Sequence, residues 1–541
     1  MSLMGSLYIG ASGLQTSQNA LNTTAHNMSN VDTVGYTRQQ VQLGTRTYKT
    51  ISKSAASNAY LQTGHGVNYT QVKQVRDYFL DKAYRREAGR SAYYDTSAVV
   101  VEEMENLFQE LEGRAFAGAI SNLWTSVQEM AKDPGNAVNQ GVFVQRCSEF
   151  LSRAKAVYTG LSEYQDNLNY QVAQQVNTMN AYAKRISELN QEIVKIESGK
   201  VEHANDLKDE RNQLIDELAS MGYIDVREDA DGNALIRLEG KDFVKADSYN
   251  EICLYTDKET GFYTPYWKQL AETNIVNGIE EVNIQGAELF NMQQIISTDR
   301  NTDIGALKAM LVARGDRRAT HKDLDPAYYD KDIKQSLIMN VQAEFDQLVN
   351  KLTTAINKVF ADAAARETAK DPNSTYMRDP ATGDPYTIFN TMAVNDPANP
   401  NNDFTVENII INGTIKQAPS LLGFKKPDGK IDQETADIMK EVFTEEAYTL
   451  NPNVKTATNF INYYNNLISQ VGNTGSALWG ISENQQLTVD SIAAAREQVL
   501  GVSSDEEMSN MVMFQNAYNA SSRYINVISE MLEHIIVSLG R

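Results

Sequence analysis

Two long stretches at opposite ends of the chain carry the same spacing of apolar side chains. Near the N-terminus the positions alternate at intervals of four and three residues: Leu3, Leu7, Gly10, Leu14, Ser17, Leu21, Thr24 and Met28. Near the C-terminus the series is Met511, Phe514, Tyr518, Ser521, Ile525, Ile528, Leu532 and Ile535. This spacing places all members of a series on one face of an α-helix, so each stretch is predicted to be an amphipathic helix with one stripe.

Neither terminal helix is expected to be stable alone. The other face of the N-terminal helix is Ser, Gln, Asn and Thr, and Gly5, Gly10 and Gly13 each lower helix propensity by about 1 kcal/mol relative to Ala. Ser504 and Glu507 form a predicted capping box ahead of the C-terminal helix. We expect the two helices to pair with each other, or with neighbouring copies, as a coiled coil; the alternative is two core helices of one closed domain.

Between the ends, helical and extended patterns alternate along the chain. Residues from about 95 to 221 are helical almost throughout, with a break at Asp133-Pro134-Gly135 that predicts a helical hairpin. Further helices are expected around residues 341–359 and 456–499. Residues from about 223 to 318 show the alternation and the Asp-Gly and Thr-Gly turns of strands, and residues 367–450 are irregular with a short strand at 407–412.

These patterns predict an α+β multidomain protein. Its parts are discontinuous terminal helices (coiled coil), a long α-helical bundle and one or more β-rich inserted outer domains. The expected boundaries are 1–60 with 505–541 for the terminal coiled coil, 61–222 with 321–366 and 451–504 for the bundle, and 223–320 for the β-rich insertion. Residues 367–450 form a second, irregular insertion that packs either on the bundle or on the first insertion.

Charge narrows the range of partners. The 541 residues include 49 Lys and Arg against 70 Asp and Glu, a net charge of -21, which repels phosphate backbones and anionic lipid surfaces. We therefore expect no nucleic acid partner. No stretch approaches the ~18 consecutive apolar residues of a membrane span, and the N-terminus lacks a basic region followed by a compact apolar one, so neither membrane insertion nor the general secretory signal is expected.

The sequence gives little indication of a catalytic or metal site. The two cysteines, Cys147 and Cys253, exclude a disulfide framework, and none of the five histidines lies within four positions of another. The segment Asp229-Ala-Asp231-Gly232 resembles part of a calcium-binding loop. If Gly232 takes the sixth position of such a loop, Arg227 and Leu238 take the first and twelfth positions, where carboxylates belong. A tight turn is therefore favoured. We expect no catalytic residues, no metal site and no cofactor.

The segment after the first helix carries the most specific signal. It reads Asn27-Met-Ser-Asn-Val-Asp-Thr-Val-Gly-Tyr-Thr-Arg-Gln39 and follows Ala20, Leu21 and Asn22. This resembles the N-terminal signature of the flagellar rod, hook and hook-associated family, in which a helix with "ALN" and "N-x-x-N" elements runs into "T-x-G-Y". The matching positions are Asn27, Asn30, Thr33, Gly35, Tyr36 and Arg38.

Two further segments resemble the hook-associated protein 1 group of that family. The C-terminal run Gly501 to Asn510, followed by Phe514-Gln515-Asn-Ala-Tyr518, is similar to the end of that group. The internal run Ala204 to Leu214 is similar to its "PNDLLDQRDQL", with departures at Ala204 and Glu210. Without the resemblance, Asp206, Asp209 and Arg211 of this run read as the solvated face of a helix.

The resemblance implies a structural subunit of the bacterial flagellum that joins hook to filament by heterologous self-assembly and works outside the cell. It implies flagellar type III export and, as partners, other copies in a ring or helical turn, hook protein, the second hook-filament junction protein and an export chaperone of the FlgN kind. The assembly interface would comprise Leu3, Leu7, Leu14, Leu21 and Met28 of the first helix. On the last helix, Met511, Phe514, Tyr518, Ile525, Ile528, Leu532 and Ile535 would serve assembly and chaperone binding.

Three other functions stay open at this stage. The chain could be a hook or distal rod subunit, although the long central helices and the run at 205–214 favour the hook-associated group. It could be an axial protein whose inserted domain is enzymatic or adhesive. A cytosolic coiled-coil scaffold would usually carry charged positions beside the stripes of its terminal helices, which this chain lacks.

Overall fold

The chain folds as two compact units, each built from segments far apart in sequence. The computed structural model describes residues 3–53, 60–108, 116–199, 202–276, 279–379, 382–392 and 403–539. Unit 1 comprises Met1–Gly89, Thr178–Glu251 and Gln485–Arg541, and unit 2 comprises Arg90–Asn177 and Ile252–Asn484. Three long helices contribute residues to both units: α2 (Tyr78–Phe108), α4 (Ala137–Glu197) and α10 (Phe460–Leu500). The predicted α+β multidomain class is confirmed.

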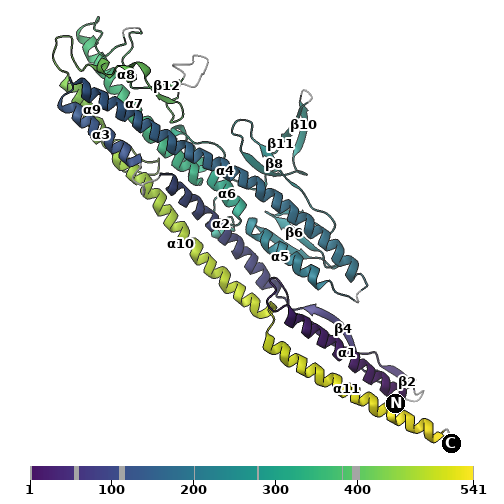
Figure 1. Cartoon of the computed structure of the whole chain (residues 1–541). Coiled ribbons are helices and arrows are strands. Elements are labelled where there is room, and N and C mark those ends of the chain that lie inside the picture. Colours follow the sequence, from purple (N-terminus) through teal and green to yellow (C-terminus); the bar gives the residue numbers. More distant parts are fainter. Residues whose placement is uncertain are drawn as a thin grey trace. The chain divides into compact units, whose positions relative to one another are not determined.

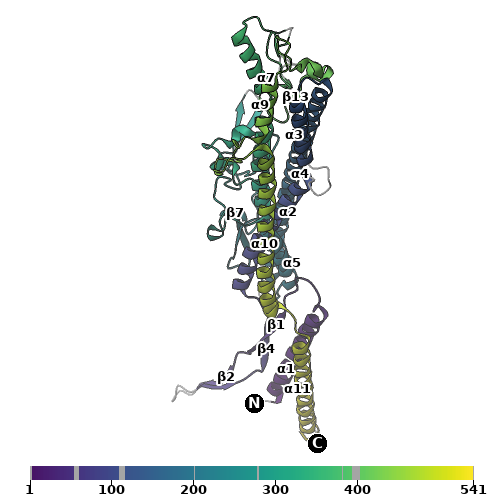
Figure 2. The ribbon, with the colours of Figure 1, turned by 90° about the vertical axis from the view of Figure 1, so that its left-hand side faces the viewer.

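Unit 1 contains both terminal helices and small antiparallel sheets. Its helices are α1 (Leu3–Ser29), α5 (Asn205–Met221) and α11 (Ser504–Leu539). Its strands are β1 (Gln39–Thr45), β2 (Lys49–Lys53), β3 (Tyr60–Thr63), β4 (Val67–Gln74), β5 (Ile224–Glu228), β6 (Ala234–Leu238) and β7 (Lys241–Val244). Strand β1 pairs with β4, β2 with β3, and β5, β6 and β7 form one sheet. In Figures 1 and 2 α1 and α11 lie side by side, and β4 lies beside α1.

Unit 2 is a helical core with strand pairs attached. Its helices are α3 (Phe116–Lys132), α6 (Ala306–Arg314), α7 (Leu337–Lys370), α8 (Gly413–Gln417) and α9 (Gln433–Thr444), with short helical turns at 298–300, 321–324, 329–333 and 419–422. Its strands pair in order as β8 (Ile252–Thr256) with β9 (Tyr263–Trp267), β10 (Glu272–Val276) with β11 (Ile279–Asn283), and β12 (Phe389–Thr391) with β13 (Ile409–Ile411). Each of these sheets has two strands.

Aromatic side chains form the centre of unit 2. The ring of Phe116 lies 5.3 Å from that of Phe150, 4.9 Å from Phe345 and 5.1 Å from Tyr464, so α3, α4, α7 and α10 meet there. The predicted break is confirmed, because α3 ends at Lys132 and α4 begins at Ala137. Buried residues of the second insertion, Phe389 and Phe424 among them, belong to the same core. That insertion therefore packs on the helices, one of the two possibilities left open by the sequence.

Candidate functional site: the terminal helix pair and its joint

The terminal helices pack against each other in antiparallel directions. Gly10 lies opposite Ile525, and Gly13 lies opposite Ser521. On α11 the side chains with the least exposure include the predicted stripe, namely Met511, Phe514, Tyr518, Ile525, Ile528 and Leu532, whereas Ile535 near the end of the helix is exposed. The stripe of α11 thus forms its contact face with α1 within one chain. Its role between chains stays a prediction.

The contact face of α1 coincides with the predicted stripe only at its small members, Gly10, Ser17 and Thr24. Its buried residues are small or polar: Gly10, Ser12, Thr16, Ser17, Ala20, Thr24 and Asn27. The predicted Leu3, Leu7, Leu14, Leu21 and Met28 are only partly buried, because they flank this face. A Cβ atom on Gly10 would lie 2.7 Å from Cγ1 of Ile525, and one on Gly13 would lie 2.7 Å from Oγ of Ser521. The glycines that lower helix propensity therefore allow the two backbones to approach closely.

A second stripe on each terminal helix faces outward and carries no charge. On α11 it consists of Met513, Ala517, Ala520, Tyr524, Val527 and Met531, again at intervals of four and three. On α1 the corresponding exposed positions are Met4, Tyr8, Ala11, Gln15, Gln18, Asn22 and Ala25. Val527 is 48% exposed and Tyr8 64% exposed, although both are large and hydrophobic. Sequence reasoning missed these stripes; the same spacing, started at Met513 or at Met4, could have found them.

The signature segment after α1 is closed by its own polar side chains. Asn27 donates from Nδ2 to the carbonyl of Gln39 at 2.8 Å, and its Oδ1 accepts from the hydroxyl of Tyr36 at 2.7 Å. Asn30 accepts a hydrogen bond from Thr33 at 3.1 Å. Gly35 has a φ of +81°, a conformation that strains residues with a Cβ. Five of the six signature residues therefore shape one turn.

The sixth signature residue, Arg38, joins this turn to the start of α11. Its backbone N-H donates to the carbonyl of Leu500 at 2.8 Å, and its guanidinium lies 2.8 Å from carboxylate oxygens of both Glu506 and Glu507. Glu507 is buried. The predicted capping box at Ser504 and Glu507 is wrong by one position: Ser503 accepts from the N-H of Glu506, while the Glu507 side chain binds Arg38.

The signature segment also binds the internal run that resembles the same family. Asp209 of α5 accepts hydrogen bonds from the backbone N-H and the hydroxyl of Thr37, at 3.2 and 2.6 Å, and from Gln74 at 2.9 Å. Burial raises the pKa of the Asp209 carboxyl above its ordinary value, and burial likewise raises that of Tyr36. The two motifs, separated by 172 positions between Thr37 and Asp209, form one joint. Asp209 is therefore not a solvated residue, contrary to the sequence expectation.

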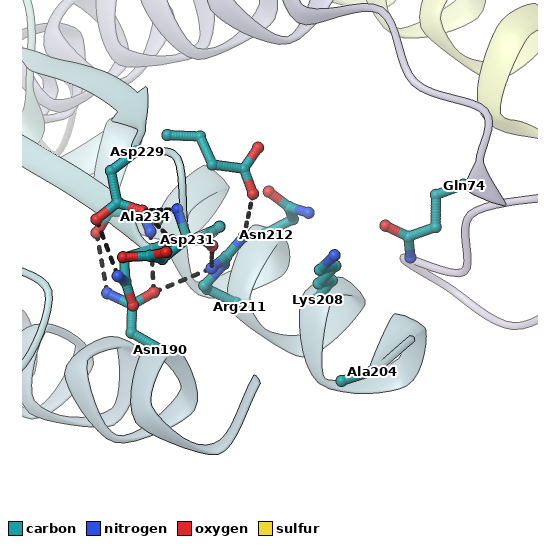
Figure 3. Close-up of polar contacts among 12 residues, drawn as sticks. Gln74, Asn190, Ala204, Lys208, Arg211, Asn212, Asp229, Asp231 and Ala234 are labelled. Carbon is teal, nitrogen blue, oxygen red and sulfur yellow. Dashed lines mark hydrogen bonds and ion pairs between the residues drawn. The ribbon is translucent and has the colours of Figure 1, made fainter. Parts of the chain in front are cut away.

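Arg211 is also not on a solvated face, contrary to the sequence expectation. Its side chain is buried and donates to Asn190 Oδ1 at 3.0 Å and to the carbonyl of Gly232 at 2.7 Å (Figure 3). It also pairs with Glu228 at 3.3 Å, and burial lowers the pKa of the guanidinium below its ordinary value. Arg211 thereby holds the turn between β5 and β6 against α4. Asp206, in contrast, is exposed, as expected.

The predicted turn at Asp229 is also confirmed. The carboxylate of Asp229 accepts from the backbone N-H groups of Asp231 and Asn233 at 3.0 and 2.9 Å, and Gly232 has a φ of +85° (Figure 3). Among the described residues no group of three or more His, Cys, Asp or Glu side chains is placed to hold a metal ion. Over the same part of the chain, no helix is both long and apolar enough to cross a membrane.

Three family models match separate parts of the chain. Residues 101–369 match the model of the helical domain of the flagellar hook-associated protein FlgK. Residues 7–37, which include most of α1 and most of the signature segment, match the flagella basal body rod protein model. Residues 499–537, which include most of α11, match the C-terminal model of the flagellar basal body rod FlgEFG proteins.

Relatives align over nearly the whole chain. Flagellar hook-associated protein 1 of Bacillus subtilis is 26% identical over 97% of this chain and 96% of its own length. The proteins of the same name from Salmonella typhimurium and Escherichia coli are 23% and 22% identical, each over 97% of this chain and 98% of their own length. The solved structure of the flagellar hook junction protein FlgK from Burkholderia pseudomallei matches with a TM-score of 0.54 and 12% identity, over 77% of this chain and all of that one. That structure supports the fold.

Proposed function

Because the chain belongs to the flagellar hook-associated protein 1 family, we propose that it is a structural subunit that joins hook to filament by heterologous self-assembly. Residues 1–60 with 505–541 serve as the polymerisation domain, and the inserted segments 223–320 and 367–450 are outer parts. The observation that carries the proposal is the outward pair of uncharged stripes on α1 and α11, which a lone subunit leaves in water.

These stripes suit contacts between identical subunits. A head-to-tail contact joins two different surfaces and repeats along an assembly, so each subunit needs two exposed faces. The outward stripe of α11 offers Tyr524, Val527 and Met531, and that of α1 offers Met4 and Tyr8. We propose that the stripe of α11 in one copy packs against α1 of the next, in addition to the pairing of α1 with α11 within each subunit.

We propose further that the terminal helices fold when a subunit docks. Of the described side chains of α11, only Glu507 and Ile528 are buried. Full burial of one apolar side chain contributes roughly 1.5–3 kcal/mol, whereas ordering each residue's backbone costs about 1–2 kcal/mol. The helix pair alone is therefore marginal, and contacts with neighbouring copies supply the missing burial. Disorder before docking prevents premature assembly.

The partners in this proposal follow from family membership. They are other copies of the chain in a ring or helical turn, hook protein on one side and the second hook-filament junction protein on the other. A chaperone of the FlgN kind covers the stripe of α11 from Met511 to Ile535 before flagellar type III export, and the assembled protein is extracellular. No catalytic step or cofactor is part of the proposed role, and the curated relatives are named as hook-associated proteins.

A matched pair of α11 variants tests the proposal. Val527→Glu with Met531→Glu places carboxylates on the outward stripe, and Asn526→Glu places one on the neighbouring face, which already carries Arg523, Glu530 and Glu533. In cells that contain only the variant chain, the double variant should be exported but absent from purified flagella, and the cells should lose motility. Asn526→Glu should assemble normally. Normal incorporation of the double variant would contradict a contact through this stripe.

A further inference from the structure

Helix α10 carries an uncharged outward face within unit 2. Its positions recur at intervals of three and four residues: Asn462, Asn466, Ser469, Asn473, Ser476, Gly480 and Asn484. All of these residues are exposed except the partly buried Gly480. The whole segment from Phe460 to Ser482 contains no charged residue, although 22% of the chain is charged. A solvated face of a long helix ordinarily carries Lys, Arg, Asp or Glu, so this absence calls for a physical reason.

The exposed face of α4 in the same unit shows the ordinary pattern. It includes Arg153, Glu163 and Asp166. The two faces belong to one unit and to helices of similar exposure, so the difference does not arise from a generally uncharged unit. The uncharged face of α10 also contains an open, shallow groove of about 570 Å³ lined by Asn466, Ser469 and Asn473 among others. Beside it, Trp479 is 37% exposed and Ile481 42% exposed. Tryptophan is enriched at the centres of protein contacts.

The same kind of helix face is already used for packing inside this chain. The buried face of α1 consists of Gly, Ser, Thr, Ala and Asn, and it packs closely on α11 through Gly10 and Gly13. Such residues let two backbones approach, and their amide and hydroxyl groups can hydrogen bond across the contact. The outward face of α10 has a matching composition, with Asn, Ser and Gly. It is therefore suited to close contact with another protein surface.

Charge indicates which protein that is. A chain of net charge -21 repels its own copies unless the surfaces that meet carry no acidic groups. The outward stripes of α1 and α11 obey this condition, and so does the face of α10. The face offers no cations for a phosphate backbone and few large apolar groups for a lipid surface. We propose that the face of α10 from Asn462 to Gly480 is a second contact surface for another copy of this chain in the assembled layer.

This inference rests on the proposed self-assembly and adds a contact outside the terminal helices. Its test is the pair Ser469→Glu with Asn473→Glu on α10, against the pair Ala156→Glu with Thr159→Glu on the exposed face of α4. Both pairs add two negative charges at exposed helical positions of unit 2. Circular dichroism of the purified chains first confirms that each pair is folded. Flagella purified from cells that contain only the variant then give the amount of assembled chain relative to hook protein.

We expect the α10 pair to reduce the assembled amount at least about tenfold, because a carboxylate loses its hydration in a close uncharged contact and finds no cation there. The α4 pair should leave the assembled amount unchanged. Asn473→Arg should also reduce assembly, because a close uncharged contact excludes either sign. Normal assembly of the α10 pair or of Asn473→Arg would overturn the inference. If Val527→Glu with Met531→Glu still blocks assembly in that case, the proposed function stands and only the inferred contact through α10 is refuted.

Discussion

Replacing Glu344 by Gln should stabilise unit 2 at alkaline pH. Glu344 lies on α7 with no exposed surface, and its carboxylate accepts hydrogen bonds from Asn451 at 2.8 Å and Gln470 at 2.9 Å. Both donors are neutral amides. Burial raises the pKa of the Glu344 carboxyl from 4.5 to about 7, in spite of these hydrogen bonds, which lower it. The folded protein therefore holds this proton more tightly than the unfolded chain does.

The sign and size of the effect follow from this difference. Between pH 4.5 and 7 the unfolded chain loses the proton first, so the free energy of unfolding falls as pH rises through this window and then levels off. A difference of about 2.5 pH units, at about 1.4 kcal/mol each, amounts to about 3 kcal/mol. Burial also raises the pKa of the neighbouring Tyr329 and Tyr463, so both stay neutral over this range. Glutamine removes the charge and keeps one acceptor oxygen for Asn451.

Urea unfolding followed by tryptophan fluorescence measures unit 2 selectively, because Trp124, Trp267 and Trp479 are all in that unit. At pH 8 Glu344→Gln should be more stable than the parent by up to about 3 kcal/mol, and the difference should vanish near pH 4.5. Glu446→Gln, at an exposed position, should change little at either pH. A stability difference for Glu344→Gln that is the same at both pH values, or a loss of stability at pH 8, would refute the reasoning.

Three further predictions concern unit 1. Gly10→Ala with Gly13→Ala should favour the helix by about 1 kcal/mol each yet reduce incorporation into flagella, because both Cβ atoms collide with α11; Ser29→Ala, at an exposed position outside the outward stripe, should not reduce it. Asp209→Ala should lower the free energy of unfolding by about 1–3 kcal/mol in circular dichroism, because it removes the acceptor of the Thr37 N-H and hydroxyl, whereas the exposed Asp206→Ala should not. Arg211→Ala should lower the free energy of unfolding by about 3 kcal/mol in the same assay. Arg227→Ala, which removes a side chain that is 69% exposed, should have a negligible effect, and equal effects of the two variants would contradict the role of Arg211.

Features with a local cause could be predicted from the sequence. The stripe of α11 is visible because its members are large and apolar, and the break between α3 and α4 follows from Pro134. The signature turn is local as well, since Asn27 bonds to Tyr36 and Gln39 within the same segment. The spacing found Gly10, Ser17 and Thr24 of the α1 contact face but not Thr16 or Ala20, because small and polar residues resemble a solvated face until the partner helix is in place.

The buried charges depend on residues distant in sequence and were missed for that reason. Asp209 and Arg211 lie at helical positions that fit a solvated face, but Thr37 and Asn190 cover them. Glu344 falls within a helix of mixed residues, and only Asn451 and Gln470, more than a hundred positions away, identify it as a buried carboxylate. The resemblance of the segment 204–214 to a known family gave no indication that Asp209 and Arg211 are covered by other parts of the chain.

Amide hydrogen exchange, read residue by residue on the free subunit and on assembled flagella, tests the central claim most directly. The account predicts that amides of α1 and α11 exchange without protection in the free subunit, whereas those of α3, α4 and α7 are protected, and that α1 and α11 become protected after assembly. Protection of α1 and α11 in the free subunit equal to that of α4 would contradict folding on docking and would favour a closed domain formed by the two chain ends.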